Sequence, residues 1–198
     1  MPQLSALDEL AARARQCVAC GLSDKRRNVV FGEGNPNSPL VLIGEGPGDQ
    51  EDATGRPFVG RSGKLLDQAL LDNGLDRSDV YICNTVKCRA CDWLEGKPFN
   101  RPPTEAEVAT CRPWLEQQLG IIAPRVILCI GAPSAKNIIR KNFLITKERG
   151  KLFPSDYAEF TVATLHPAYI LRQQSQASDG GFSLLVDDIA LAWMTANR

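Results

Sequence analysis

Short runs of consecutive apolar residues alternate along the chain with longer segments whose apolar residues recur every three or four positions. Runs that are apolar throughout are typical of strands buried on both faces, and the longer period is typical of helices. This pattern predicts helices at about 5–15, 64–73, 104–119, 133–140 and 183–196, and loops at 21–37, 90–103 and 173–181. It predicts strands at 40–43, 80–83, 126–130 and 160–164.

The alternation of strands with helices predicts an α/β fold in which a parallel sheet is covered by helices on both faces. The pairs Ser5 with Asp8, and Thr104 with Glu107, have the spacing of capping boxes that open the first and third of these helices. The chain of 198 residues is long enough for one domain with a full core and short for two.

The composition is that of an ordinary globular protein, with 43% hydrophobic and 23% charged residues. There is no apolar run long enough to cross a membrane and no secretory signal pattern, so we expect a cytoplasmic protein. The formal net charge of zero argues against a protein that coats nucleic acid non-specifically. It does not exclude a protein that contacts a few phosphates locally.

The four predicted strands each end at a residue suited to a binding site. In parallel sheets, ligands bind beyond the carboxyl ends of the strands. Gly44 follows the first strand, Asn84 the second and Gly131 the third, and His166, the single histidine of the chain, follows the fourth. We therefore expect a glycine turn, an amide side chain and an imidazole to meet at one edge of the sheet.

The glycine turn, GEGPGDQEDATGRPFVG at residues 44–60, has an unusual charge for its shape. Bare glycine backbone after a strand often cradles phosphate, because its N–H groups can approach an anion closely. Here four carboxylates in the turn would repel phosphate, so a different ligand is indicated. These carboxylates belong to Glu45, Asp49, Glu51 and Asp52.

Seven cysteines in a chain with no export signal suggest metal ligation or burial rather than disulfides. Two of them lie inside apolar runs and are predicted to be small buried hydrophobic residues. The others form two CxxC pairs and one further thiol, which favours a four-thiolate site for zinc or an iron–sulfur cluster. The buried pair is Cys83 and Cys129, and the remaining five are Cys17, Cys20, Cys88, Cys91 and Cys111.

Several motifs in this order resemble those of the iron–sulfur uracil-DNA glycosylases, family 4 of the uracil-DNA glycosylase superfamily. They are GEGPGDQED, GRPFVG, TVKC, ITKERG, HPAYILR and the spaced cysteines, and they span residues 17–172. The resemblance implies a three-layer α/β/α sandwich around a parallel four-stranded sheet. It also implies a single domain over residues 1–198, with an iron–sulfur loop formed by residues 17–20 and 88–111.

The resemblance further implies a monomeric enzyme that flips uracil out of single- or double-stranded DNA, since a base inside the helix cannot be reached. Hydrolysis of the N-glycosidic bond would leave an abasic site for base excision repair. Phe58 matches the aromatic residue that stacks on the base, Asn84 the amide that reads its edge, and His166 the donor to uracil O2. Gly44 and Gly46 would let the backbone approach the base and deoxyribose.

The acid that handles the attacking water is left open between Glu45 and Glu51, while Asp52 is expected to brace the loop. Gly46 stands where some other branches of the superfamily carry an aspartate. Arg172 is a candidate contact to phosphate or the minor groove. Lys87 is the only lysine close in sequence to Asn84, and beside Cys88 it is interpreted as a neighbour of an anionic cluster or a phosphate contact. Hydrolysis without lyase chemistry is therefore expected.

The cluster ligands implied by the resemblance are Cys17, Cys20, Cys88 and Cys111, holding [4Fe–4S]. One departure from the family pattern is the segment ACDWLEGKPF, which looks like an insertion and brings Cys91. Cys91 is therefore an alternative to Cys111 as the fourth ligand, and zinc an alternative to the cluster.

Two other functions are consistent with these features. One is a glycosylase of the same fold that acts on another deaminated or modified base, because the shape of the pocket sets the choice of base. The other is a non-catalytic iron–sulfur module that binds nucleic acid, which would explain the cysteines but not the meeting of Glu45, Asn84 and His166.

Overall fold

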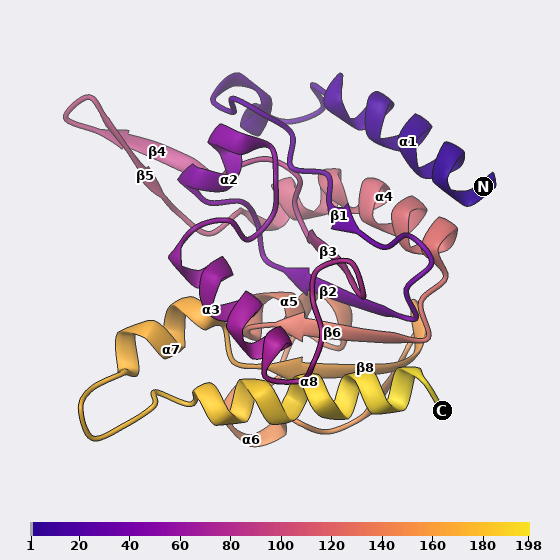
Figure 1. The fold of residues 1–198 in the computed structure, drawn as a ribbon. Coiled ribbons are helices and arrows are strands. Elements are labelled where there is room, and N and C mark those ends of the chain that lie inside the picture. Colours follow the sequence, from indigo (N-terminus) through magenta and orange to yellow (C-terminus); the bar gives the residue numbers. More distant parts are fainter. Residues whose placement is uncertain (1) are drawn as a thin grey trace.

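The computed structural model describes residues 2–198, with side chains from residue 6 onward. Its centre is a six-stranded mixed sheet in the order β1-β3-β2-β6-β8-β7 (Figure 1). The four inner strands run parallel, and the two short edge strands are antiparallel to their neighbours. The inner strands are β3 (Tyr81–Asn84), β2 (Leu40–Gly44), β6 (Val126–Ile130) and β8 (Ala158–Thr164), and the edge strands are β1 (Glu33–Gly34) and β7 (Phe153–Ser155).

The predicted α/β class is confirmed, and the predicted strands correspond to the four inner ones. The sheet was predicted to have four strands, whereas it has six, because the prediction missed β1 and β7. These edge strands have two and three residues and are only partly buried, so they lack the apolar run that marked the inner strands.

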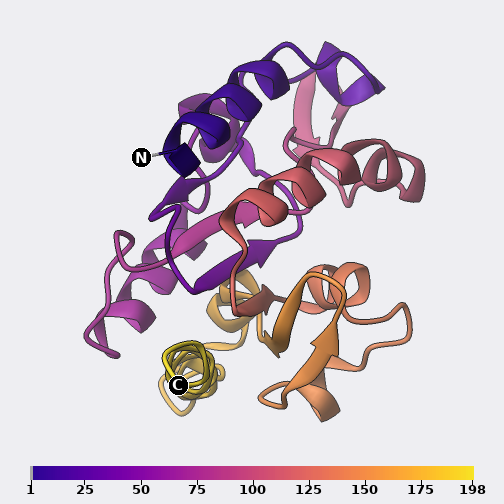
Figure 2. The same cartoon turned by 90° about the vertical axis from the view of Figure 1, so that its right-hand side faces the viewer.

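Helices cover both faces of the sheet (Figures 1 and 2). Alternate residues of β2 show why its sequence is apolar throughout: Val41 and Ile43 pack on one side, and Leu40 and Leu42 on the other. The first side is covered by α1 (Pro2–Arg15), α4 (Glu105–Ile122) and α5 (Ala132–Ile138), and the second by α3 (Arg61–Leu71), α7 (Pro167–Gln173) and α8 (Phe182–Ala196).

The helix boundaries test the predicted capping signals. Thr104 caps α4 as predicted, since its hydroxyl accepts from the Glu107 N–H at 3.2 Å and the Glu107 carboxylate accepts from the Thr104 N–H at 2.7 Å. The helix runs past Gly120 and ends with Ala123 in the left-handed region, at φ 50°. The predicted start of α1 at Ser5 was wrong, because the helix already begins at Pro2.

Four further short helical segments, α7 among them, were not predicted, and the loop predicted at 90–103 is partly wrong. The other three are α2 (Asp49–Thr54), α6 (Ile145–Glu148) and a 3₁₀ turn at Gly21–Asp24. Within 90–103, strands β4 (Cys91–Leu94) and β5 (Lys97–Asn100) form an antiparallel hairpin. Across the part of the chain that the structure describes, no helix is long and apolar enough to span a membrane.

Candidate active site

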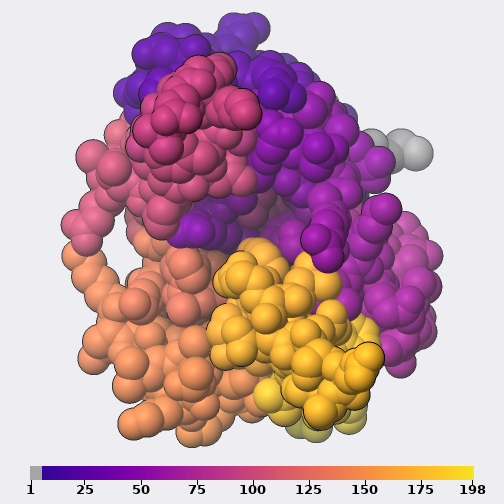
Figure 3. Space-filling view, turned by 90° about the vertical axis from the view of Figure 1, so that its left-hand side faces the viewer, coloured from indigo at the N-terminus to yellow at the C-terminus, as the bar shows by residue number. Residues whose placement is uncertain are grey.

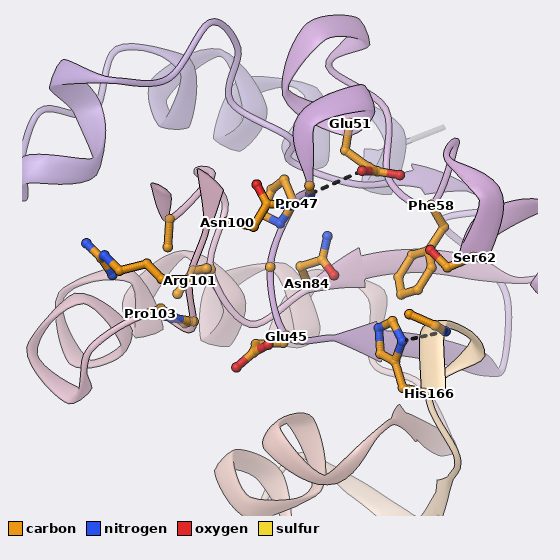
Figure 4. Close-up of a pocket in the computed structure, with 15 residues that line it drawn as sticks. Glu45, Pro47, Glu51, Phe58, Ser62, Asn84, Asn100, Arg101, Pro103 and His166 are labelled. Atoms are coloured by element: carbon orange, nitrogen blue, oxygen red, sulfur yellow. Dashed lines mark hydrogen bonds between the residues drawn. The ribbon is translucent and has the colours of Figure 1, made fainter. Parts of the chain in front are cut away.

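A cavity of about 240 Å³ opens at the carboxyl ends of β2 and β3, beside the start of α7 (Figure 4). Such a volume lies below the range of drug-sized ligand pockets, about 300–1,000 Å³, so it suits a ligand as small as a single heterocycle. We call it the base cavity. It brings together six of the predicted site residues, Glu45, Gly46, Glu51, Phe58, Asn84 and His166.

Two glycines of the turn after β2 are required by close contacts rather than by an unusual φ. A side chain at Gly44 would begin 2.3 Å from the Asn84 Oδ1 atom and 2.6 Å from the Phe58 ring. A side chain at Gly46 would begin 2.7 Å from the Val86 Cγ2 atom. Gly44 and Gly46 therefore leave room for the side chains that line the cavity.

Phe58 occupies the wall of the base cavity in an uncommon backbone conformation. Its φ is 52°, in the left-handed region that bulky residues rarely adopt. The Arg77 guanidinium holds this conformation by donating hydrogen bonds to the backbone carbonyls of Pro57 and Phe58. The Phe58 ring lies 6.1 Å from the His166 ring, with 31° between the planes. A flat ligand would meet these two rings together.

Asn84 ends β3 and presents its side-chain amide to the cavity (Figure 4). The residue is 2% exposed. In the described part of the chain, its amide makes no hydrogen bond with another protein group, although its backbone carbonyl accepts one from the Lys87 ammonium at 2.9 Å. A buried amide normally has partners, so this one is available to a ligand.

His166 caps the N-terminus of α7, and this role fixes its tautomer. The Nδ1 atom accepts a hydrogen bond from the Ala168 N–H at 3.0 Å, so the proton of the neutral ring is on Nε2. Burial lowers the pKa of His166 to about 4, and the positive charge of Arg172 contributes to the lowering. At neutral pH the imidazole is therefore uncharged and can donate from Nε2 without giving up its cap.

The two candidate acids of the turn have different environments. Both oxygens of Glu51 are used by the backbone: one accepts from the N–H groups of Val59 and Gly60, each at 2.9 Å, and the other accepts from Gly48 at 3.1 Å. Among the described residues, the Glu45 carboxylate accepts no hydrogen bond, and burial raises its pKa. Glu45 is thus the carboxylate with free oxygens at the cavity.

The expectation that Asp52 braces the loop agrees with its contacts. Its carboxylate accepts a hydrogen bond from the Arg27 N–H at 2.9 Å and a longer one from the Asn28 N–H at 3.4 Å. Asp52 is almost fully buried and does not line the base cavity. It joins α2 to the segment that precedes β1.

Two other residues singled out in the sequence lie away from the cavity. Arg172 is an exposed residue in the last turn of α7. Lys87 is 2% exposed and donates to the Asn84 carbonyl and, at 2.6 Å, to the Gln118 Oε1 atom, while its ammonium lies 5.6 Å from the centre of the Phe31 ring. With these partners Lys87 reaches neither the surface nor the cavity.

Sequence reasoning missed nine residues of the cavity wall, among them Ser62 and three residues from the hairpin side. Ser62 starts from the helix that follows Phe58, and the other three come from the end of the β4–β5 hairpin. Ser62 carried no sequence signal, and the other three lie directly after the segment ACDWLEGKPF that looks like an insertion. The residues from the hairpin side are Asn100, Arg101 and Pro103.

Four cysteines line a second, largely apolar cavity between the end of α1, the segment after β3 and α4. We call it the cysteine cavity. Its members are Cys17, Cys20, Cys88 and Cys111, whereas Cys91 lies outside it at the start of β4. The four thiols share one space although, among the described residues, they are not drawn together into a ready-made metal-binding group.

The surroundings of the cysteine cavity fit an anionic, sulfur-bound group. N–H groups are directed at three of the sulfurs: Trp114 Nε1 at 3.4 Å from Cys17, Arg26 at 3.4 Å from Cys88, and the Lys87 backbone at 3.2 Å from Cys111. Burial raises the pKa of Cys88 to about 11, so without a bound cation the thiol keeps its proton. A metal centre would supply that cation.

Comparison with known proteins places this architecture in a family. A model of the uracil DNA glycosylase superfamily matches residues 31–190. The chain is 45% identical to a type-4 uracil-DNA glycosylase of Thermotoga maritima, with 85% of each chain covered. It is 41% identical to the type-4 enzyme of Sulfurisphaera tokodaii (85% of this chain, 77% of the relative) and 40% identical to that of Pyrobaculum aerophilum (84% and 85%). The chain therefore belongs to the uracil DNA glycosylase superfamily, and within it to the type-4 family.

Proposed function

We propose that this protein is a monofunctional uracil-DNA glycosylase, which removes uracil from DNA by hydrolysis and leaves an abasic site for base excision repair. The observation that carries the proposal is the base cavity itself. An aromatic ring, an unpartnered amide and a neutral imidazole with its proton on Nε2 meet there, next to a carboxylate with free oxygens. Each of these groups has a counterpart on uracil or on its reacting sugar.

Recognition follows from the chemistry of a flipped base. Phe58 offers a flat apolar face on which the pyrimidine can stack. The Asn84 amide carries both a donor and an acceptor, which match uracil O4 and N3–H respectively. Cytosine presents the reverse pattern, a donor at position 4 and an acceptor at N3, so an Asn84 held in one orientation selects uracil.

Bond cleavage places negative charge on the leaving base and positive charge on the sugar. His166 donates from Nε2 to uracil O2 as that oxygen becomes negative, and a preorganised donor of this kind stabilises the transition state. Glu45 holds the attacking water near C1′ and stabilises the oxocarbenium-like sugar by its charge. Glu51 acts as a positioning residue, because its bonds to three backbone N–H groups join the glycine turn to the segment that carries Phe58.

A groove beside the base cavity offers a path for the DNA backbone, and its three cationic side chains outnumber the carboxylates of Glu45 and Glu105. This groove, of about 520 Å³, shares Glu45 and Pro103 with the cavity. Phosphate contacts of this kind position a protein on DNA without reading its sequence. The three cations are Arg112, Lys136 and Lys141. Arg172, exposed on α7, is retained as a further contact to phosphate or the minor groove.

The cysteine cavity is assigned to a [4Fe–4S] cluster held by Cys17, Cys20, Cys88 and Cys111. The shared cavity favours Cys111 over Cys91 as the fourth ligand. When bound, the cluster would stabilise the local fold by joining the N-terminal segment to α4 and to the segment after β3. A cytoplasmic, monomeric protein remains our prediction, as does action on uracil-containing DNA, single- or double-stranded.

A panel of oligonucleotides, each with one deaminated or modified base, tests the proposed reaction. The expected result is abasic-site formation in the uracil-containing strand at the position of the uracil, with free uracil released and the strand intact until heat or alkali is applied. Preferential release of another base would favour a glycosylase of the same fold that acts on another deaminated or modified base. If cluster-containing protein binds the oligonucleotides but releases no base from them, the non-catalytic iron–sulfur module would be favoured.

Borohydride treatment during the reaction separates hydrolysis from lyase chemistry, which needs an amine that forms a Schiff base with the sugar. We expect no trapped protein–DNA adduct, because the Lys87 ammonium is buried and donates to the Asn84 carbonyl and to Gln118 Oε1. An adduct that disappears in Lys87→Ala would reject the hydrolytic mechanism and make Lys87 the nucleophile.

A further inference from the structure

The hairpin of β4 and β5 projects from the body of the protein and presents apolar side chains to solvent. It pairs with no strand of the central sheet. Trp93, Leu94 and Phe99 are 56%, 66% and 47% exposed. A two-stranded hairpin is marginally stable on its own, and exposed apolar groups gathered on one element mark an interaction site.

The turn of the hairpin is well formed, so the exposure of these side chains is not a consequence of an irregular loop. Leu94 pairs with Lys97 across a two-residue turn. Both turn residues have positive φ, 50° at Glu95 and 77° at Gly96, as in the type I′ turns that match the twist of paired strands. The tip is therefore a defined element of the fold.

The root of the hairpin is fixed to the active-site region by two arginines. Arg89, almost fully buried, donates to Asn100 at 2.7 Å and to Asp49 of α2 at 2.6 Å. Arg101 donates to both carboxylate oxygens of Glu107 on α4, at 2.7 and 2.8 Å. These contacts hold the two ends of the hairpin at the rim of the base cavity.

The hairpin is continuous with the cavity wall, because its flanking residues Ala90, Asn100 and Arg101 all line the base cavity. Figure 3 shows the hairpin, in pink, beside the hollow on the face toward which the inner strands point. Trp93 is three residues beyond Ala90, about 10 Å at the rise of a strand. That distance spans about three nucleotides of a DNA strand.

The two faces of the hairpin are not equivalent. By the register, Trp93 lies opposite Pro98, and Cys91 lies opposite Asn100, so the indole shares a face with the cavity residue Asn100. Phe99 lies opposite Asp92 on the other face. Asp92 is near Arg101, at 3.3 Å, and near Lys25, at 3.9 Å, so its charge is compensated and opposes an approaching strand only weakly.

We propose that the β4–β5 hairpin is a DNA-contacting element, in which Trp93 stacks on an unpaired base of the strand close to the flipped nucleotide. This inference rests on the proposed function, since the strand must enter the base cavity nearby. Aromatic side chains serve as sequence-tolerant platforms for single-stranded bases. The hairpin extends the contact with DNA beyond the cavity without adding net positive charge, because Asp92 and Glu95 offset Lys97.

The test measures binding of the full-length, cluster-containing protein to a labelled single strand with a non-cleavable abasic-site analogue, and to the same strand without it. Loss of stacking on one base corresponds to roughly 5- to 150-fold weaker binding, so Trp93→Ala should raise Kd within that range on both strands. Trp93→Tyr should restore most of the affinity. Phe99→Ala, on the opposite face, and Met194→Ala, an exposed residue of α8, should bind as the parent does.

Two further measurements separate the hairpin from the cavity. Indole fluorescence should be quenched by the undamaged strand in the parent but far less in Trp93→Phe. Inhibition by free uracil should be the same in Trp93→Ala and the parent. Unchanged DNA affinity in Trp93→Ala, or equal losses in Trp93→Ala and Phe99→Ala, would overturn the assignment. Binding that depends on Trp93 in a protein that removes no uracil would reject the proposed function and keep the assignment.

Discussion

The base cavity and the cysteine cavity lie on the same protein but are held together differently. The base cavity is formed at the ends of paired strands, where the Thr85 N–H donates to the Gly44 carbonyl at 2.9 Å and the Val86 N–H donates to the Glu45 carbonyl at 3.1 Å. The cysteine cavity joins three segments that no strand pairing connects. The sheet therefore preorganises the first site, whereas the second would be completed by the proposed cluster.

The protonation states of the ionisable groups also differ between the two cavities. His166 is neutral at physiological pH with its tautomer fixed, so it can donate from Nε2 while Nδ1 accepts from the Ala168 N–H. Cys88, with its pKa raised to about 11, is protonated at that pH, and burial also raises the pKa of Cys111. Binding of a metal centre must therefore release protons and contribute to the stability of the fold.

A segment of five residues, from Asn84 to Cys88, connects the two cavities. Lys87 lies between them, with its ammonium on the Asn84 carbonyl and its backbone N–H on the Cys111 sulfur. The comparison can therefore be tested by substitutions in one cavity. Each test asks whether the properties of the other cavity stay unchanged.

The largest expected effect is the loss of the cofactor. Protein purified anaerobically should be brown and contain roughly four irons per chain, as for a Cys₄ [4Fe–4S] site. Cys111→Ser should abolish the visible absorbance and lower the melting temperature, because one of four ligands is lost. Cys91→Ser is the matched control and should keep both, since Cys91 lies outside the cavity. Bleaching by Cys91→Ser with colour retained in Cys111→Ser would reverse the ligand assignment.

The next largest effect concerns chemistry in the base cavity. His166→Ala removes the donor to O2 of the leaving base, and loss of one preorganised donor typically costs about 10²–10³ in rate. Single-turnover excision of uracil should fall by that factor, while iron content and visible absorbance stay at the parent level. A rate close to that of the parent would remove His166 from the mechanism, and a parallel loss of iron would show that the cavities are not independent.

A smaller effect is expected from Asn84, the residue proposed to read the base. Asn84→Asp replaces the donating amide with a carboxylate that repels uracil O4, and a bidentate base contact is worth about 1–3 kcal/mol of discrimination. The ratio of kcat/KM for uracil to that for cytosine should fall accordingly. Equal uracil excision by Asn84→Asp and the parent would show that Asn84 does not read the base.

The smallest expected effect is that of mild acid. Because burial raises the pKa of Glu45, its carboxylate begins to protonate at a higher pH than an exposed glutamate, and the single-turnover rate should decline modestly toward pH 5. His166 should add nothing to this decline, since it is protonated only near pH 4. Glu45→Gln should be slower than the parent at pH 7 and should lack the acid decline. An unchanged decline in this variant would assign it to another group.

Local features of the sequence determined the elements of the fold. The apolar run at 126–130 became β6 with the predicted bounds, and Thr104 with Glu107 opened α4, because strand burial and helix capping are properties of neighbouring residues. The order of strands and helices also brought Asn84 and His166 to one edge of the sheet, as expected for parallel strands.

The tertiary structure alone decided which side chains are free to act. Glu45 and Glu51 are six residues apart in one turn, and only the folding of Val59 and Gly60 back onto Glu51 distinguishes them. Lys87 is buried because Gln118, 31 residues away, accepts from it. Cys111, rather than Cys91, meets Cys17 because α4 packs beside α1. Such partners come from distant segments, and no local period or spacing in the sequence encodes them.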